Sequence, residues 1–152
     1  MNEALLEIRP GEVTVEAPPP EGPALYFIGV CRTPWQMTRD CPRRGDYQDG
    51  PLCRIEVDPS WGQALQGIQQ HDYLQILYWM HRARRDLALQ TPKRDGKTIG
   101  TFAIRSPNRP NPIASSLVKL EKVDGATLHV RGLDCLDGTP LVDIKPDKCP
   151  HA

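Results

Sequence analysis

The sequence predicts a small, mainly β protein whose short strands close into a barrel, with one or two short helices beside it. Sixteen prolines and twelve glycines in 152 residues, against two phenylalanines, favour short strands and turns over long helices. Several segments alternate apolar and polar residues, as half-buried strands do. The length suits one domain with a sizeable core, whereas two full domains would be cramped.

The first 23 residues are expected to form an extension outside a barrel domain at residues 24–152. The run Pro18-Pro19-Pro20 behaves as an extended spacer rather than as part of a core. Residues 7–15 could nevertheless pair as an edge strand.

Apolar segments bounded by turn signals mark the strands of the barrel domain. The segment 24–31 is apolar on both faces, and 52–57 alternates. The run 73–81 is rich in aromatic and β-branched residues and is interpreted as a central strand. An Asp-Gly turn is expected at 124–125 and another at 137–138. Further strands are expected at 99–103, 117–123, 127–132 and 141–145.

One short helix is predicted after the second strand. Asp58 is a suitable N-cap, and Pro59 suits the first turn, where its missing N–H costs nothing. Four apolar residues recur at helical spacing, and their face is expected to pack on the barrel. They are Trp61, Ala64, Leu65 and Ile68.

A stiff, proline-rich loop joins the predicted strands 99–103 and 117–123. Pro107, Pro110 and Pro112 each remove a backbone donor and fix a φ angle, so this stretch is neither helix interior nor central strand. The loop also carries two arginines and two asparagines, whose side chains suit carboxylates, phosphates or base edges. Taken alone, such a loop is more often a solvated connection than a site.

Charge and cysteine content restrict the classes of function. Lysine plus arginine equals aspartate plus glutamate at 19 each, without the overall positive field of a dedicated nucleic-acid binder. The five cysteines form no Cys-x-x-Cys motif, and the four histidines lack metal-ligand spacing, so no metal site is predicted. With no apolar leader and no long apolar run, we expect a cytoplasmic protein without a membrane segment.

The most basic segment, 82–97, precedes the proline-rich loop. It is either a solvated loop, partly neutralised by two aspartates, or an electrostatic guide for a phosphate-bearing acceptor. Its basic residues are Arg82, Arg84, Arg85, Lys93, Arg94 and Lys97.

Two long motifs carry a resemblance to a known family. Residues 102–113 (FAIRSPNRPNPI) and 132–146 (GLDCLDGTPLVDIKP) are similar, in order and spacing, to the two main motifs of the TsaA-like family, also called TrmO or YaeB. Its best-understood members are S-adenosylmethionine-dependent methyltransferases. They methylate N6 of threonylcarbamoyladenosine beside a tRNA anticodon, on a β-barrel unlike the Rossmann methyltransferases. The resemblance covers residues 25–146.

The resemblance implies S-adenosylmethionine as the cofactor, and either tRNA or a smaller methyl acceptor as the substrate. It also implies a homodimer with sites near the subunit boundary. Members that act on tRNA commonly continue into a second small domain, whereas this chain stops at Ala152. A different or smaller acceptor is therefore one of the expectations.

The resemblance places the cofactor against three segments of the chain. The first is the loop of Pro42, Arg43 and Arg44, where Arg44 replaces the family's usual glutamine. The second is the end of the central strand, with His81 and the neighbouring Arg82. The third is the loop 134–139, with cofactor contacts expected at Asp134, Cys135 and Leu136.

Five further site residues are expected, from the chemistry of methyl transfer and from this chain's departures from the family pattern. A guanidinium binds a carboxylate in a bidentate way, so Arg105 or Arg43 is expected to hold the methionine carboxylate. Ser115 puts a hydroxyl where the family has an apolar wall. Arg109 and Asn111 are candidate substrate contacts. Asp137 is the candidate acceptor of the amine proton, although an Asp-Gly turn explains this residue equally well.

Two functions remain open from the sequence. One is a methyltransferase, and the other is a regulatory module that binds S-adenosylmethionine without turnover. Release of S-adenosylhomocysteine in the presence of total tRNA would separate them.

Overall fold

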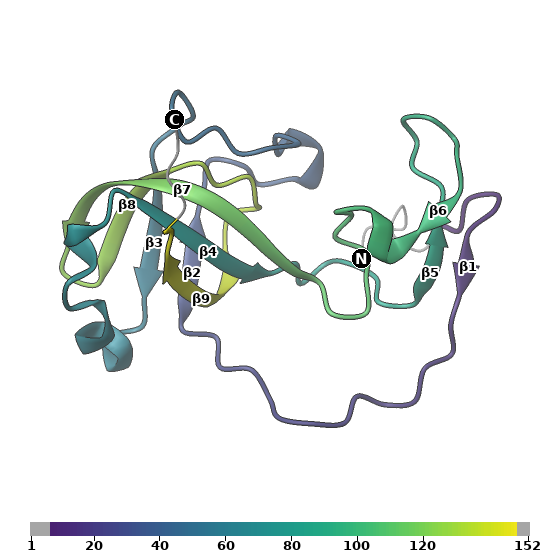
Figure 1. Ribbon diagram of the computed structural model, residues 1–152, viewed down its shortest axis with the longest axis horizontal. Coiled ribbons are helices and arrows are strands. Elements are labelled where there is room, and N and C mark those ends of the chain that lie inside the picture. The colour runs from purple at the N-terminus through teal and green to yellow at the C-terminus, as the bar shows by residue number, and fades with distance from the viewer. Residues whose placement is uncertain (1–6, 149–152) are drawn as a thin grey trace. The chain divides into compact units, whose positions relative to one another are not determined.

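The computed structural model describes residues 7–148, which divide into two compact units. The barrel unit comprises residues 25–79 and 113–148, and the insert unit comprises 7–24 and 80–112 (Figure 1). Residues 1–6 of the expected extension, and the sequence predictions at Cys149 and His151, lie outside the described residues. The proposed boundary between an extension, 1–23, and a barrel domain, 24–152, stays a prediction.

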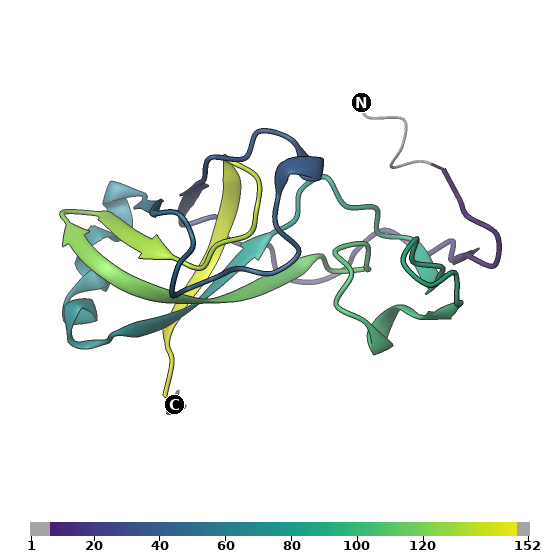
Figure 2. The ribbon, with the colours of Figure 1, turned by 90° about the horizontal axis from the view of Figure 1, so that it is seen from above.

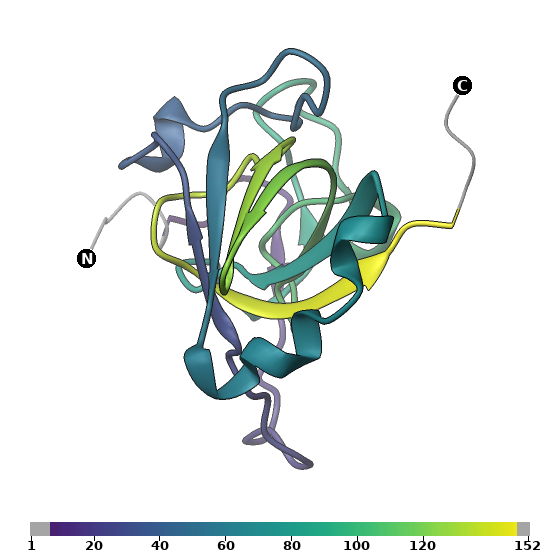
Figure 3. The same ribbon diagram turned by 90° about the vertical axis from the view of Figure 1, so that its left-hand side faces the viewer.

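The barrel unit is a closed barrel of six strands in the order β2-β3-β8-β7-β4-β9. Every neighbouring pair in it is antiparallel. Figures 1 and 3 show the barrel from two sides, and the predicted closed barrel is confirmed. The strands are β2 (Gly29–Arg32), β3 (Cys53–Val57), β4 (Tyr73–Trp79), β7 (Ile113–Asp124), β8 (Thr127–Arg131) and β9 (Thr139–Pro146).

The core of the barrel follows the two-residue period of its strands. Successive strand side chains point to opposite faces, so the alternating apolar residues of β3, β4 and β8 all enter the interior. Burying this apolar surface is what drives the barrel to close. The fully buried residues include Cys31, Ile55, Leu74, Ile76, Leu128, Val130 and Leu141.

The longest hairpin joins β7 to β8 through the predicted Asp-Gly turn, which is confirmed. Gly125 has φ +60°, the left-handed conformation that such a turn requires and that glycine adopts without a Cβ clash. Figure 2 shows β7 curving across the barrel from this hairpin. A register shift between Leu120 and Lys122 marks a β-bulge in the hairpin.

The first strand of the barrel is shorter than its apolar run predicted. The strand β2 begins at Gly29, not at residue 24, and its backbone lies so close to β3 that a Cβ would be 2.2 Å from the carbonyl oxygen of Glu56. The preceding aromatic residues pair with other rings instead of joining the ladder. Tyr26 lies 6.3 Å from Trp61 and Phe27 lies 6.4 Å from Trp79, measured between ring centroids.

The predicted helix is present as short 3₁₀ segments, η3 (Pro59–Leu65) and η4 (Ile68–Gln70). The N-cap prediction is confirmed, because Asp58 Oδ1 accepts a hydrogen bond from Ser60 N at 2.9 Å. The predicted apolar face was wrong in part. Leu65 is buried, but Trp61 is 45% exposed, since three residues per turn do not keep the α-helical spacing on one side. A further segment, η2 (Thr38–Asp40), was not predicted.

The last strand also differs from the prediction at 141–145. It begins at Thr139, and its buried residues are Thr139 and Leu141. The ladder to β4 skips Val142, because Tyr78 pairs with Leu141 and Leu77 pairs with Asp143. This irregularity interrupts the simple alternation that the sequence indicated.

The insert unit holds a three-stranded sheet in the order β1-β5-β6. The expected edge strand among residues 7–15 is confirmed, since Val13 pairs with Leu89. The predicted strand at 99–103 was wrong after Gly100. The chain turns there into η5 (Thr101–Ala103), because the Thr101 hydroxyl is buried and donates to Leu87 O at 2.7 Å. The strands are β1 (Val13–Thr14), β5 (Leu87–Gln90) and β6 (Ile99–Gly100).

Candidate functional site

The loop between β8 and β9, residues 132–138, is the motif loop of the barrel unit. Gly132 has φ +121°, and a Cβ on it would lie 2.5 Å from Leu117 O, so only glycine fits. The loop 42–45 packs directly on it. A Cβ on Gly45 would lie 1.7 Å from Gly132 O, so the two backbones are in contact. The structure therefore brings together two of the three segments expected at the cofactor.

Asp137 fastens the motif loop to the loop that follows β2. Its Oδ1 accepts a hydrogen bond from Thr33 N at 3.1 Å, and its Oδ2 accepts one from Gln36 Nε2 at 3.4 Å. Arg32 Nη1 lies 3.9 Å from the same Oδ2. The backbone N–H of Asp137 donates to Trp35 O at 2.8 Å. Both carboxylate oxygens are engaged, which favours a role in joining the loops.

The backbone carbonyl groups of Cys135 and Leu136 accept hydrogen bonds from side chains of the protein itself. Thr33 Oγ1 donates to Cys135 O at 2.7 Å, and Thr139 Oγ1 donates to Leu136 O at 2.7 Å. Both side chains are buried, at 1% and 8% exposure. The contact with Cys31 and the burial raise the pKa of the Cys135 thiol, so this thiol stays protonated.

Asp134 lies in a cluster of three polar side chains at the barrel interior. Its Oδ1 accepts hydrogen bonds from the Tyr78 hydroxyl and from Ser116 Oγ, the latter at 3.3 Å. The Tyr78 and Ser116 hydroxyl oxygens lie 2.7 Å apart. Because Tyr78 gives its one proton to Asp134, the Ser116 proton is shared between Tyr78 Oη and Asp134 Oδ1. Burial and the charge of Asp134 raise the pKa of Tyr78 far above that of an exposed tyrosine. The tyrosine is therefore a neutral donor.

Ser115 faces away from this cluster. Its Oγ accepts a hydrogen bond from Gln75 Nε2 at 2.6 Å, whereas its neighbour Ser116 points inward. Successive residues of a strand lie on opposite faces, so Ser115 and Asp134 do not face the same space.

The arginines divide into two groups. Four of the arginines expected at the cofactor, Arg43, Arg44, Arg82 and Arg105, are exposed and have no hydrogen bond or ion pair with any residue of 7–148. Their guanidinium groups are available to an anion. Arg32 and Arg84 are instead paired with carboxylates, at 2.6 Å from Glu56 and 2.7 Å from Asp86.

The proline-rich loop lies in the insert unit and is held by its own side chains. Arg109 Nη1 donates to Ile104 O at 3.1 Å and to Ser106 O at 3.0 Å. Asn111 Oδ1 accepts from Arg85 Nη2 at 3.4 Å, and Arg85 Nε donates to Pro110 O at 2.6 Å. These groups stiffen the loop, and the substrate contacts at Arg109 and Asn111 stay predictions.

The expected site residues are thus distributed over both units. The insert unit holds His81, Arg82, Arg105, Arg109 and Asn111, and the barrel unit holds the others. Sequence reasoning missed Thr33, Tyr78 and Ser116, which bind the motif loop. Ser116 could have been found, because it shares the inward face of β7 with Val118.

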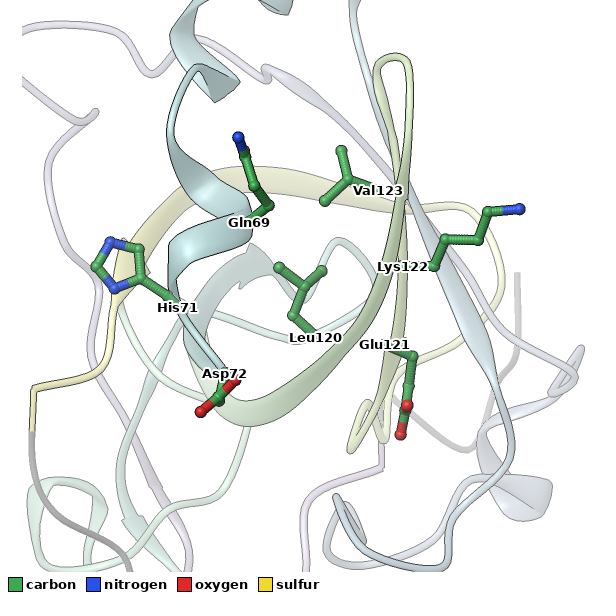
Figure 4. Close-up of a pocket in the computed structure, with 7 residues that line it drawn as sticks. All are labelled: Gln69, His71, Asp72, Leu120, Glu121, Lys122 and Val123. Atoms are coloured by element: carbon green, nitrogen blue, oxygen red, sulfur yellow. The ribbon is translucent and has the colours of Figure 1, made fainter.

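A pocket of about 610 Å³ lies elsewhere on the barrel unit, between η4 and β7. Figure 4 shows Leu120 and Val123 directed into the space between η4 and β7, with Gln69 on the η4 side, while Lys122 points away. None of the expected site residues lines it. Its remaining lining residues are His71, Asp72 and Glu121.

Within residues 7–148, no group of three or more His, Cys, Asp or Glu side chains is placed to hold a metal ion. No helix in these residues is long and apolar enough to span a bilayer.

The fold and the packed loops define a class of small β-barrel proteins in which the motif loop, 132–138, packs on the loop 42–45 at one end of β8. The tRNA-methyltransferase O N-terminal domain matches residues 30–148. The chain therefore belongs to the family of the tRNA-methyltransferase O N-terminal domain.

Several known proteins are similar to this chain. The probable S-adenosyl-L-methionine-binding protein VirR of Rhizobium radiobacter is 49% identical over 93% of this chain and 80% of its own length. A tRNA (adenine(37)-N6)-methyltransferase of Mus musculus is 40% identical over 55% of this chain and 20% of its own length. The crystal structure of TrmO from Pseudomonas aeruginosa has a TM-score of 0.69 and 30% identity, over 84% of this chain and 56% of that chain. The chain spans little more than half of that solved protein.

Proposed function

We propose that this protein is an S-adenosylmethionine-dependent methyltransferase. The observation that carries the proposal is the contact between the two predicted cofactor loops, with Gly45 packed against Gly132. Arg43 and Arg44 directly precede Gly45 in this loop, and their guanidinium groups are unpaired within residues 7–148. The names of the relatives as S-adenosylmethionine-binding proteins and as a tRNA methyltransferase support the choice of cofactor.

The residues present fit this cofactor. Arg43 or Arg44 would bind the methionine carboxylate, because an exposed guanidinium has five donors in a planar fork. Arg105 is the equivalent candidate from the proline-rich loop. The bound cofactor would supply an activated methyl group. The protein's task is to hold the acceptor nitrogen in line with that group and to exclude water.

The proposed acceptor is a modified tRNA adenosine or a smaller related molecule. The basic residues of segment 82–97 support a phosphate-bearing acceptor, since Arg82 and Arg94 are unpaired within the described part of the chain. Asp137 as the acceptor of the amine proton stays a prediction. We also propose that the protein acts in the cytoplasm as a homodimer, which light scattering of the purified chain would test.

The proposal is tested by incubating the full chain with labelled S-adenosylmethionine and tRNA with or without the threonylcarbamoyl group. We expect S-adenosylhomocysteine to form with at least one acceptor. A chain that binds the cofactor but forms no product with tRNA or with small molecules of a cell extract contradicts the methyltransferase.

A regulatory module is the second candidate function. The name of the relative from Rhizobium radiobacter, which mentions binding alone, favours it. The same assay separates the two, because a module binds S-adenosylmethionine tightly in calorimetry and releases no S-adenosylhomocysteine.

A further inference from the structure

The second oxygen of Asp134 is open while the first is saturated. Oδ1 accepts hydrogen bonds from both Tyr78 and Ser116. No group within residues 7–148 donates to Oδ2, and Oδ2 is not a buried atom. The carboxylate is therefore held by one oxygen, and the other is solvent-accessible and has no donor among residues 7–148.

The neighbours of this open oxygen belong to the cofactor loops. Asp134 is part of the motif loop, whose Gly132 contacts Gly45. Cys41, just before the loop 42–45, has its pKa raised to about 11 by burial and by the nearby Cys135 and Asp134. Asp134 is thus close enough to Cys41 for its charge to act on the thiol.

Asp134 contrasts with Asp137 in the same loop. Asp137 uses both oxygens to join Thr33 and Gln36. Asp134 has one engaged oxygen and one open oxygen. A carboxylate anchored in this way loses little rotamer entropy when it binds, which increases its contribution to affinity.

We propose that Tyr78 and Ser116 are positioning residues that fix Asp134, so that Oδ2 accepts a hydrogen bond from an N–H or O–H donor of the bound cofactor. The inference rests on the proposed function. Three parts of S-adenosylmethionine carry such donors: the adenine amino group, the ribose diol and the ammonium group. A hydrogen bond to an ionised carboxylate is stronger than one between neutral groups, which suits any of the three.

The test is a double-mutant cycle on the affinity of the full chain for S-adenosylmethionine, measured by calorimetry. Tyr78→Phe removes the hydroxyl and keeps the ring, and we expect it to weaken binding about tenfold. Asp134→Asn is expected to weaken binding by at least as much. The double variant is expected to bind no more weakly than Asp134→Asn alone, because Tyr78 acts only through Asp134.

The controls separate positioning from general loss of stability. Tyr73→Phe makes the same change on the same strand and is expected to leave affinity unchanged. Ser116→Ala should weaken binding, and Ser116→Thr should restore it, because threonine retains the hydroxyl. Thermal unfolding of each variant confirms that it is folded at the assay temperature. If Tyr78→Phe does not fold, Ser116→Ala completes the same cycle with Asp134→Asn.

A further arm distinguishes the nucleoside donors from the ammonium group. 5′-Methylthioadenosine keeps the adenine and the ribose and lacks the amino acid. If Asp134 binds the ribose or the adenine amino group, Asp134→Asn weakens this ligand as much as it weakens S-adenosylmethionine. If Asp134 binds the ammonium group, the affinity for 5′-methylthioadenosine does not change.

Two different results would overturn the inference. A wild-type chain that binds no S-adenosylmethionine overturns the proposed function and this inference with it. A wild-type chain that binds it, with Tyr78→Phe and Asp134→Asn additive or without effect, overturns the inference alone.

Discussion

The carboxylate of Asp137 accepts a hydrogen bond from the backbone N–H of Thr33 at 3.1 Å, across 104 positions of the sequence. The return contact runs from Asp137 N to Trp35 O at 2.8 Å. These two bonds tie the end of β2 to the motif loop. The geometry of that loop therefore depends on residues far from it in the chain.

Replacing Asp137 with alanine should destabilise the barrel unit. Thr33 is buried, so its N–H would lose its partner with little access to water. We expect the free energy of unfolding to fall by about 1–3 kcal/mol, measured by urea denaturation. Gln36→Ala, which removes an exposed 3.4 Å bond to the same carboxylate, should change it by less than about 0.5 kcal/mol. Equal stability of Asp137→Ala and wild type would contradict the joining role.

Replacing Arg105 with alanine should abolish S-adenosylmethionine binding and leave the fold intact. Arg105 is exposed and makes no hydrogen bond or ion pair with the described chain, so its loss costs no native contact. Calorimetry measures the affinity, and circular dichroism follows the fold. Arg54→Ala, at an exposed arginine of β3, is the matched control. Undiminished affinity would remove Arg105 from the site.

The thiols of Cys41 and Cys53 should react slowly with iodoacetamide. Burial, together with the nearby Cys135, raises the pKa of each to about 11, so about one thiol in a thousand is ionised at pH 8. Mass spectrometry of the labelled chain should show rates that rise with pH up to about 11. Labelling in denaturant provides the unprotected reference. Equal labelling rates in the native and the unfolded chain at pH 8 would contradict the raised pKa values of the two thiols.

The same shifts make the fold less stable at alkaline pH. Between the unfolded pKa, near 8.5, and the folded pKa, about 11, the folded state binds more protons than the unfolded state. The free energy of unfolding should therefore fall as the pH rises through this window. Cys53→Ser should reduce this dependence of the free energy of unfolding on pH. Denaturant titrations at pH 8 and pH 10 measure the difference.

The insert unit should lose stability in acid. The hydrogen bonds and charge of Arg84 lower the pKa of Asp86 below its usual value, so the ionised carboxylate stabilises the folded state. This stabilisation is present above about pH 4 and is lost as the pH falls through the folded pKa. Amide exchange of β5 should speed up over that range. Asp86→Asn should reduce the acid dependence and leave the part due to Glu12, whose pKa the hydrogen bonds from Arg9 and Thr91 lower against the effect of burial. An acid profile that does not change in Asp86→Asn would contradict the role of Asp86.

The strand pattern was readable from the sequence where one face of a strand is buried. The alternation of β3 and the Asp-Gly turn between β7 and β8 were both predicted. The strand boundaries that were predicted wrongly are set by tertiary contacts. Gly29, where β2 begins, depends on a close approach to Glu56, and the strand at 99–103 ends because Thr101 buries its hydroxyl. Neither contact is local in the sequence.

Candidate site residues could be named from the sequence, but their hydrogen-bond partners could not. The resemblance identified Asp134 and Arg105, yet sequence spacing could not tell an open carboxylate from an engaged one. That distinction depends on Tyr78 and Thr33, which lie on other strands and loops. Arg109 shows the reverse case, because an arginine in a binding-type motif donates to carbonyls of its own loop.

The pairing of Trp79 with Ile113 puts the last residue of β4 opposite the first residue of β7. Residues 80–112 therefore leave and re-enter the barrel at one pair of opposed residues, as a hairpin loop does. Replacing this segment with a short turn would leave every residue pair between β4 and β7 in place. The segment between β4 and β7 can therefore differ in length and sequence while the motif loop between β8 and β9 keeps its form.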